Sequence, residues 1–234
     1  MDWLFDFARG PLFLMTFSFM VLGLLRQVYL QTSHLLEAVS KLRYRDFSLW
    51  RNIRSSMEWV VPLGHIYRNR SVMRLVSFLF HICLLVVPIF LVHHIDLWNR
   101  HVGISWPGIS LQTGDVFTLL VIAGGLSLLL FRVCDRGVRA MSTVMDYLLL
   151  VLILIPFATG FLASHPGLCP TSYKLMMLLH ILSAELLFVL IPHTKLVHCV
   201  LFAFDRISSD IFWRMPAGAG ERVARELHGE DARV

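Results

Sequence analysis

The chain has 234 residues, of which 56% are hydrophobic and only 16% are charged, and its mean hydropathy is +0.67. These values exclude an ordinary soluble domain and indicate that lipid surrounds most of the chain. The formal net charge of +5 does not indicate nucleic-acid binding, because the basic residues gather in the connections between apolar stretches. The four cysteines are scattered without CxxC or CxxCH spacing, which argues against iron–sulfur ligation or covalently attached haem within this chain.

Five apolar stretches are each long enough to cross a bilayer, at residues 10–30, 75–95, 116–131, 147–162 and 173–205. Lipid offers the backbone no hydrogen-bond partner, and these stretches lack the alternation of barrel strands. The prediction is therefore an all-α membrane protein with a bundle of five transmembrane helices. The first ten residues lack the basic start and small-residue cleavage site of a removable signal, so we expect the first span to remain as an anchor.

The distribution of basic residues predicts the orientation of the chain. Lysine and arginine are concentrated in residues 31–74 and 132–146, whereas the connections 96–115 and 164–174 hold one each. Because basic connections stay in the cytoplasm, we expect the N-terminus outside and the C-terminus inside. Residues 31–74 are then a cytoplasmic interfacial segment of a membrane domain at 1–205, and residues 206–234 form a cytoplasmic tail.

Within the five spans, histidines occur only in the second and the fifth. The second has no Asp, Glu, Lys or Arg but carries three histidines, and the fifth carries three more (His81, His93, His94, His180, His193, His198). Spans three and four carry no candidate ligand, and we expect them to be scaffold, with Pro156 and Gly160 bending the fourth.

Opposite crossing directions would bring histidines of the two spans together in two pairs. His81 and His198 would meet near the cytoplasmic side, and His94 and His180 near the outside. Two neutral imidazoles are the axial ligands of a b-type haem, so the pattern predicts two haems. The alternative is that each histidine only hydrogen-bonds a backbone carbonyl or a side chain.

Helical phase leaves two of these assignments open. His93 and His94 lie twelve and thirteen residues after the first histidine of their span, and an ideal helix favours neither. On the fifth span, His198 shares the helix face of His180, whereas His193 better matches the depth of the opposite pair.

Two groups of motifs resemble a known family. The run from His180 to His198, with Pro192 and TKLVH, resembles the fifth helix of the respiratory nitrate reductase gamma subunit, where histidines at this separation ligate two b haems. The runs FHICLLVVPIFLVHHIDLW, GISWP and TGFLASHP resemble related cytochrome b subunits of sulfur-metabolising bacteria, the DsrM and TmcC types. The first resemblance favours His198 and the second favours His94. The histidine spacing of the second span is longer than in the nitrate reductase subunit.

The resemblance implies a dihaem cytochrome b subunit in the bacterial cytoplasmic (inner) membrane. Such a subunit carries electrons between a quinone, here expected to be menaquinone, and a cytoplasmic iron–sulfur subunit, with a periplasmic cytochrome c subunit as a further partner. The chain would be the quinone-interacting subunit of a multi-subunit oxidoreductase, with no catalytic residue of its own and no nucleic-acid partner. The alternatives are a transporter or channel in which histidines handle metal ions or protons, and a purely structural anchor. The direction of electron flow stays open.

Several other residues have two interpretations each. Glu185 lies inward of His180 and would either handle protons or hydrogen-bond a neighbouring helix. Lys195 would neutralise haem propionates or extend to lipid phosphate. Three residues near the outer haem would either form a quinone pocket or serve as interfacial anchors (Trp98, His101, Trp106).

Overall fold

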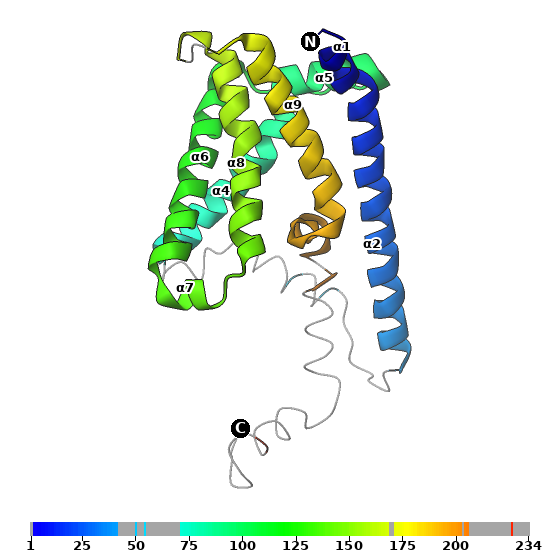
Figure 1. Ribbon diagram of the computed structural model, residues 1–234. Coiled ribbons are helices and arrows are strands. Elements are labelled where there is room, and N and C mark those ends of the chain that lie inside the picture. The colour runs from blue at the N-terminus through cyan, green and yellow to red at the C-terminus, as the bar shows by residue number, and fades with distance from the viewer. Residues whose placement is uncertain are drawn as a thin grey trace. The chain divides into compact units, whose positions relative to one another are not determined.

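The structure is a computed structural model. It describes residues 2–41, 50, 54, 71–168, 171–202, 204–205 and 226, and the described residues form helices and no strand. Five helical stretches are long and apolar enough to cross a membrane: Asp2–Glu37, Val72–Phe90, Leu111–Cys134, Val144–Ser164 and Tyr173–His193. The prediction of an all-α protein with five spans is confirmed (Figure 1). Most of the segment 42–70 and of the tail 206–234 lies outside the described residues, so the predicted boundary at 205 stays a prediction.

The chain divides into two units. Unit 1 comprises Met1–Ser18 and Leu63–Val189, and unit 2 comprises Phe19–Pro62 and Leu190–Val234. Unit 1 holds α1 (Asp2–Phe7), the π-helical turn η1 (Ala8–Leu12), the start of α2 (Phe13–Lys41), α4 (Ser71–Phe90), α5 (Val92–Val102), α6 (Leu111–Cys134), α7 (Arg136–Ala140), α8 (Val144–Ser164), η3 (Pro166–Leu168) and α9 (Tyr173–Leu190) up to Val189. Unit 2 holds the rest of α2 and two 3₁₀ turns, η4 (Ile191–His193) and η5 (Lys195–Val197).

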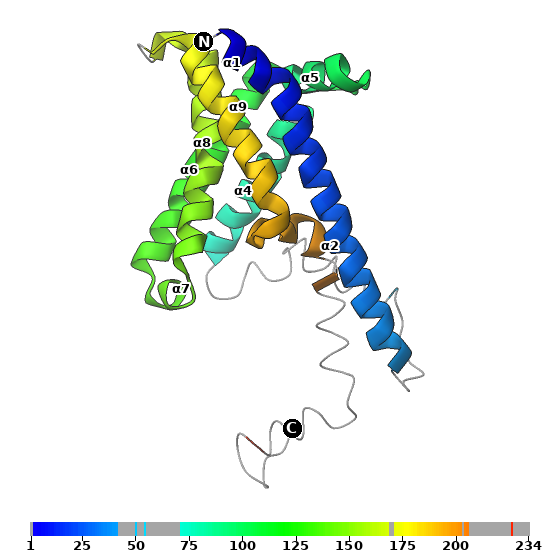
Figure 2. The ribbon, with the colours of Figure 1, turned by 45° about the vertical axis from the view of Figure 1, so that its right-hand side comes forward.

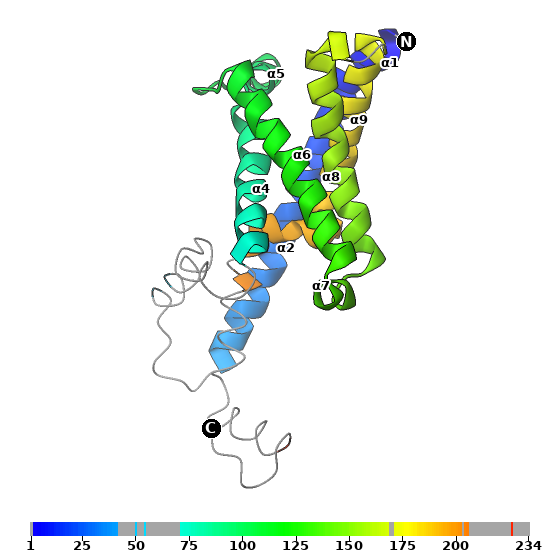
Figure 3. The same cartoon turned by 90° about the vertical axis from the view of Figure 1, so that its left-hand side faces the viewer.

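Small residues let the central helix of unit 1 approach its neighbours closely. Helix α6 contacts α4 and α8 (Figure 3). A Cβ at Gly124 would lie 3.2 Å from Phe80 Cβ, and one at Gly125 would lie 2.5 Å from Leu154 Cδ2. Helix α6 therefore packs tightly against Phe80 of α4 at Gly124 and against the Leu154 side chain of α8 at Gly125.

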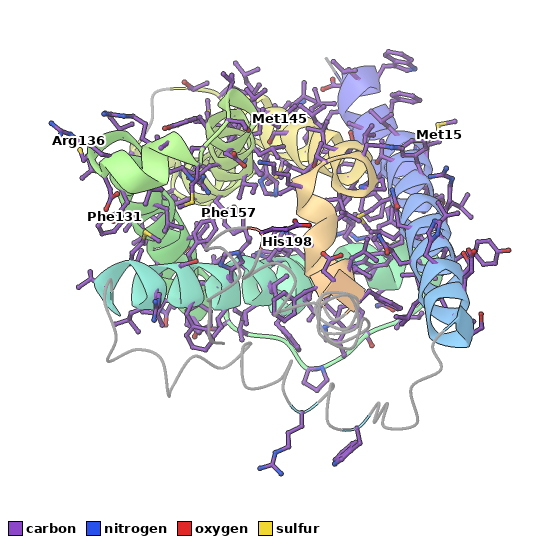
Figure 4. All side chains as sticks on the ribbon, turned by 90° about the horizontal axis from the view of Figure 1, so that it is seen from below. Met15, Phe131, Arg136, Met145, Phe157 and His198 are labelled. Carbon is purple, nitrogen blue, oxygen red and sulfur yellow. The ribbon has the colours of Figure 1, made fainter. Side chains whose placement is uncertain are left out.

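Polar caps end the helices on either side of the basic connection 132–146. Asp135 caps α7 by accepting from two backbone amides, and Thr143 forms a reciprocal capping box with Asp146 at the start of α8. The Tyr147 hydroxyl donates to the Arg132 carbonyl at 3.0 Å, which joins α8 to the end of α6. Seen from below, Arg136 extends away from the helices, whereas the buried Phe157 lies among them (Figure 4). The connection is therefore a short, well-capped turn with an exposed basic side chain.

The second span is shorter than predicted. Residues 75–95 do not form one helix, because α4 ends at Phe90 and Leu91 has extended backbone (φ −65°, ψ 128°). A non-local contact holds this break: Leu91 forms an isolated bridge with Ile109, whose amide donates to the Phe90 carbonyl at 2.7 Å. Helix α5 then begins at Val92 in a new direction and lies at the same end of unit 1 as α1 (Figure 2).

The fifth span also ends earlier than the predicted 173–205. Helix α9 stops at Leu190, because Pro192 has no backbone N–H and its ring disfavours further helix. Thr194 is extended (φ −124°, ψ −178°), and its hydroxyl caps η5. Within unit 2, the Gln27 amide donates to the Pro192 carbonyl at 3.0 Å, and Gly23 of α2 makes room for the proline ring. The helical phase that related His198 to His180 therefore does not hold.

Candidate functional site

Two of the predicted ligand histidines meet in unit 1. His94 lies in the first turn of α5 and His180 lies in α9, and their ring centroids are 6.0 Å apart with planes inclined by only 5°. Both side chains are half-buried, whereas the neighbouring His93 is exposed. The structure thus brings together the predicted outer pair and selects His94 over His93 as the partner of His180.

Backbone carbonyls set the orientation and tautomer of both rings. Nδ1 of His94 donates to the Val87 carbonyl at 3.2 Å, and Nδ1 of His180 donates to the Pro156 carbonyl at 2.7 Å. A carbonyl oxygen can only accept, so each proton resides on Nδ1 and each Nε2 keeps its lone pair. Metal-bound histidines commonly show this arrangement, with the second nitrogen donating to a carbonyl or carboxylate.

A glycine on α8 makes room for the His180 ring. A Cβ at Gly160 would lie 2.8 Å from Nδ1 and 2.9 Å from Cε1 of His180. The span at 147–162, expected to be scaffold, thus positions the His180 ring through the Pro156 carbonyl and the space at Gly160. The proline and the glycine, four residues apart, were visible in the sequence, but their contact with His180 was not.

The pair also has the protonation and spacing that a shared metal ion requires. Burial, with the neighbouring His180 imidazole, lowers the pKa of His94 to about 4, so this ring is neutral at physiological pH. A metal–imidazole bond is about 2 Å long. Two imidazoles that hold one metal ion must therefore lie close together, and the centroid separation of 6.0 Å shows that His94 and His180 do.

The second predicted pair is divided between the two units. His81 lies on α4 of unit 1, where its Nδ1 donates to the Ser77 carbonyl at 2.7 Å. His198 follows η5 in unit 2, where its Nδ1 donates to the Lys195 carbonyl at 2.5 Å. Both histidines show the same carbonyl contact as the first pair, and their pairing stays a prediction.

The competing histidines lack this contact. Among the described residues, the rings of His93 and His193 have no recorded hydrogen bond, and both side chains are exposed. The His193 ring instead contacts the Phe19 ring of unit 2 at a centroid distance of 5.5 Å.

The three residues proposed for a quinone pocket have different surroundings. Trp98 and His101 of α5 belong to an aromatic cluster with rings from α2 and α9 (Phe13, Phe17, Phe188), at centroid distances of 4.6–6.2 Å. The Trp106 indole donates to the Ile89 carbonyl at 3.0 Å and ties the loop after α5 to α4. Trp98 and His101 follow His94 by four and seven residues, so all three share one face of α5.

Comparison with known proteins identifies the family. The nitrate reductase gamma subunit family matches residues 47–176. The chain belongs to this family. A protein of Nitratidesulfovibrio vulgaris (strain Hildenborough) is 30% identical over 224 residues, which cover 94% of this chain and 97% of the relative. No solved structure matches. The family match includes His81 and His94 and ends before His180.

Family membership confirms the resemblance to the nitrate reductase gamma subunit and establishes the general role of the chain. It is a multi-pass membrane electron-transfer subunit of the cytochrome b type. The family binds haem and associates with other subunits of nitrate reductase-like complexes.

One buried ionisable residue of this gamma-family chain has no hydrogen-bond partner among the residues that the structure describes. Glu185 lies on α9 with only 3% of its surface exposed, and neither carboxyl oxygen has a hydrogen-bond partner among the described residues. The interpretation of Glu185 as a structural hydrogen bond to a neighbouring helix is therefore not supported there.

Sequence reasoning missed one polar contact near the ends of two spans. Nε2 of His165, just after α8, lies 3.4 Å from Oδ2 of Asp115 on α6, and its Nδ1 donates to the Phe161 carbonyl at 2.9 Å. The contact joins the start of α6 to the end of α8, the helix that makes room for His180. The sequence shows Asp115 and His165 in two connections expected on the same side of the membrane, which could have suggested this contact.

Proposed function

We propose that this chain is a dihaem cytochrome b subunit that transfers electrons between menaquinone and redox partner subunits. The single observation that carries the proposal is the His94–His180 pair. Two half-buried imidazoles lie nearly parallel at 6.0 Å, and each donates from Nδ1 to a backbone carbonyl. Haem supplies one-electron redox chemistry when bound.

The ligand count favours haem over an ion held by protein side chains alone. A protein-only metal site usually gathers about four ligands. In the described part of the chain, no cluster of three or more His, Cys, Asp or Glu residues could hold a metal ion. Haem needs only two ligands from the protein, and His94 and His180 would supply them. This comparison disfavours the metal-transporter alternative.

The chain's own groups would hold the haem in a fixed orientation. His94 and His180 would ligate the iron through Nε2, because Nδ1 of each is engaged by a carbonyl. Gly160 leaves the space in which the His180 ring sits. The apolar spans would exclude water from the porphyrin faces.

The second haem would be ligated by His81 and His198, with Lys195 facing its propionates. The family resemblance supports His198 over His193, and a hydrogen bond from Nδ1 to a backbone carbonyl orients the rings of His81 and His198.

The remaining parts of the proposal concern orientation and partners. With the N-terminus outside and the C-terminus in the cytoplasm of a bacterial inner-membrane protein, the His94–His180 haem lies near the outer side. Quinone would bind there, beside Trp98, His101 and Trp106. A cytoplasmic iron–sulfur subunit would dock at the basic segment 41–74, and a periplasmic cytochrome c subunit is the further partner. The basic residues of that segment support this arrangement.

The test is spectroscopic. The purified protein should show b-type bands in its reduced-minus-oxidised spectrum and two haems per chain. The variant His180→Ala should retain one haem. A folded wild-type protein without b-type bands would contradict the proposal and favour the transporter or anchor alternatives.

A further inference from the structure

The feature that the proposed electron path leaves unexplained is the Glu185 carboxyl. Glu185 and Leu178 are seven residues apart and form the most buried face of α9. Both carboxyl oxygens lack a hydrogen-bond partner among the described residues. An isolated carboxylate in apolar surroundings is strongly disfavoured, so the resting group is the neutral acid. An unpaired acid also contributes no stabilising contact that would account for its position.

The position of Glu185 places it beside the aromatic cluster. It follows His180 by five residues, about 7.5 Å along the helix axis. Phe188 is one helical turn further along, and its ring contacts Phe13 and Phe17 at 6.2 and 5.8 Å. Trp98 of α5 packs against the same two rings at 5.7 and 4.6 Å. The unpaired acid is therefore adjacent to a set of aromatic rings connected to both helices that carry the ligand pair.

This setting fits one class of ligand. An aromatic cluster offers flat faces for the ring of a quinone, which has an apolar body and carbonyl oxygens that only accept hydrogen bonds. The neutral Glu185 acid offers the O–H donor that such a carbonyl needs. Trp98 also lies on the α5 face that carries His94, so a ring bound among these residues would be close to the electron carrier.

We propose that Glu185 is the group that exchanges a proton with the quinone at this site. The inference rests on the proposed function, which supplies the electrons through the haem at His94 and His180. Reduction of a quinone to a quinol adds two electrons and two protons. Glu185 supplies one proton: its O–H bond breaks as an O–H bond forms on one quinone oxygen, and the carboxylate is then reprotonated from water at the membrane surface. The second proton reaches the other quinone oxygen from the same water. Quinol oxidation runs through the same steps in reverse.

The kinetic test compares Glu185→Gln with a matched control. Glu226→Gln makes the same chemical change at an exposed residue of the tail. Haem reduction by a short-chain naphthoquinol is followed by stopped-flow absorbance in haem-loaded protein, and reduction by dithionite serves as the quinone-independent reference. Glu185→Gln should keep both haems and its dithionite rate, and its naphthoquinol rate should fall about 100-fold, the usual range for loss of an acid–base group. Glu226→Gln should match the wild type.

Three outcomes separate this inference from the proposed function. An unchanged naphthoquinol rate in Glu185→Gln overturns the role of Glu185 and leaves the dihaem assignment intact. A wild-type protein with two haems that naphthoquinol does not reduce overturns the quinone part of the proposed function and this inference with it. A Glu185→Gln protein that loses haem or aggregates shows a structural role and overturns the inference.

Two readouts do not depend on turnover. Infrared spectroscopy of the wild type should show the carbonyl band of a buried, protonated carboxylic acid, which Glu185→Gln should lack; an unchanged band overturns the inference. Glu185→Leu should unfold at the wild-type temperature or higher, because it removes an unpartnered polar group from the buried face of α9. A clearly lower unfolding temperature would show that the carboxyl stabilises the fold and would overturn the inference.

Discussion

In the dihaem protein proposed above, replacing Gly160 with alanine is expected to remove the haem at His94 and His180 and to leave the second haem in place. The added methyl group would lie 2.8 Å from Nδ1 and 2.9 Å from Cε1 of His180. The shorter distance is about 0.6 Å inside the 3.4 Å at which ordinary contact begins. Metal–ligand distances tolerate deviations of only about 0.2 Å. The imidazole must therefore move further than a metal bond allows.

Helix propensity acts in the opposite direction, which makes the prediction specific. Alanine is favoured over glycine in a helix interior by about 1 kcal/mol, so α8 itself should not be weakened by the change. The expected loss is local and steric. It should appear as a fall from two haems per chain to one, with the same residual reduced-minus-oxidised spectrum as His180→Ala.

Gly167→Ala is the matched control, because a Cβ at that position meets nothing within 4 Å and the residue lies just beyond the same helix. It should keep both haems. Full haem content and an unchanged spectrum in Gly160→Ala would refute the geometry of the His180 cradle. Loss of both haems would point to a general folding defect and would also contradict the local steric argument.

Three further predictions concern the remaining alternatives. His94→Ala should lose the same haem as His180→Ala, whereas His93→Ala should keep two haems, as measured by haem-to-protein ratio; the opposite result would refute the choice made by the ring geometry. His198→Ala should lose the other haem and His193→Ala should retain it, and two haems in the first variant would reject that ligand. Gly23→Ala places a methyl group 2.6 Å from the buried proline ring of unit 2. It should lower the free energy of unfolding by about 1–3 kcal/mol in thermal or denaturant unfolding, and unchanged stability would contradict this close packing.

The membrane spans were predictable from sequence because their cause is local. Each apolar run must satisfy its backbone hydrogen bonds internally in lipid, so length and composition suffice to find a helix. The outer pair was also predictable, since opposite crossing directions place His94 and His180 at the same end of two spans. The sequence could not show the hydrogen bond from Nδ1 to a backbone carbonyl, which occurs at the four predicted ligands and also at His101 and His165, so it orients a ring without marking it as a ligand.

The errors arose where distant contacts override a continuous helical pattern. The break at Leu91 depends on its pairing with Ile109, and no pattern within residues 75–95 encodes that contact. Helical phase could not decide between His93 and His94, because these two residues lie on α5 and His81 lies on α4. Pro192 was visible in the sequence, but a proline can either kink a helix or end it. In the structure the helix ends, and the Pro192 carbonyl accepts a hydrogen bond from Gln27 of unit 2, a contact that the local sequence does not show.

The carbonyl contacts of His94 and His180 tie the proposed site to helices that carry neither histidine. Both ring orientations are set by the polypeptide itself, through the Val87 and Pro156 carbonyls. The Val87 carbonyl belongs to α4 and the Pro156 carbonyl to α8, so each ring depends on a helix that carries no ligand of the proposed haem at His94 and His180. A substitution that shifts the end of α4 or the middle of α8 would therefore turn an imidazole without touching either histidine. Sequence changes that alter the proposed site can thus lie on helices where no ligand would be sought.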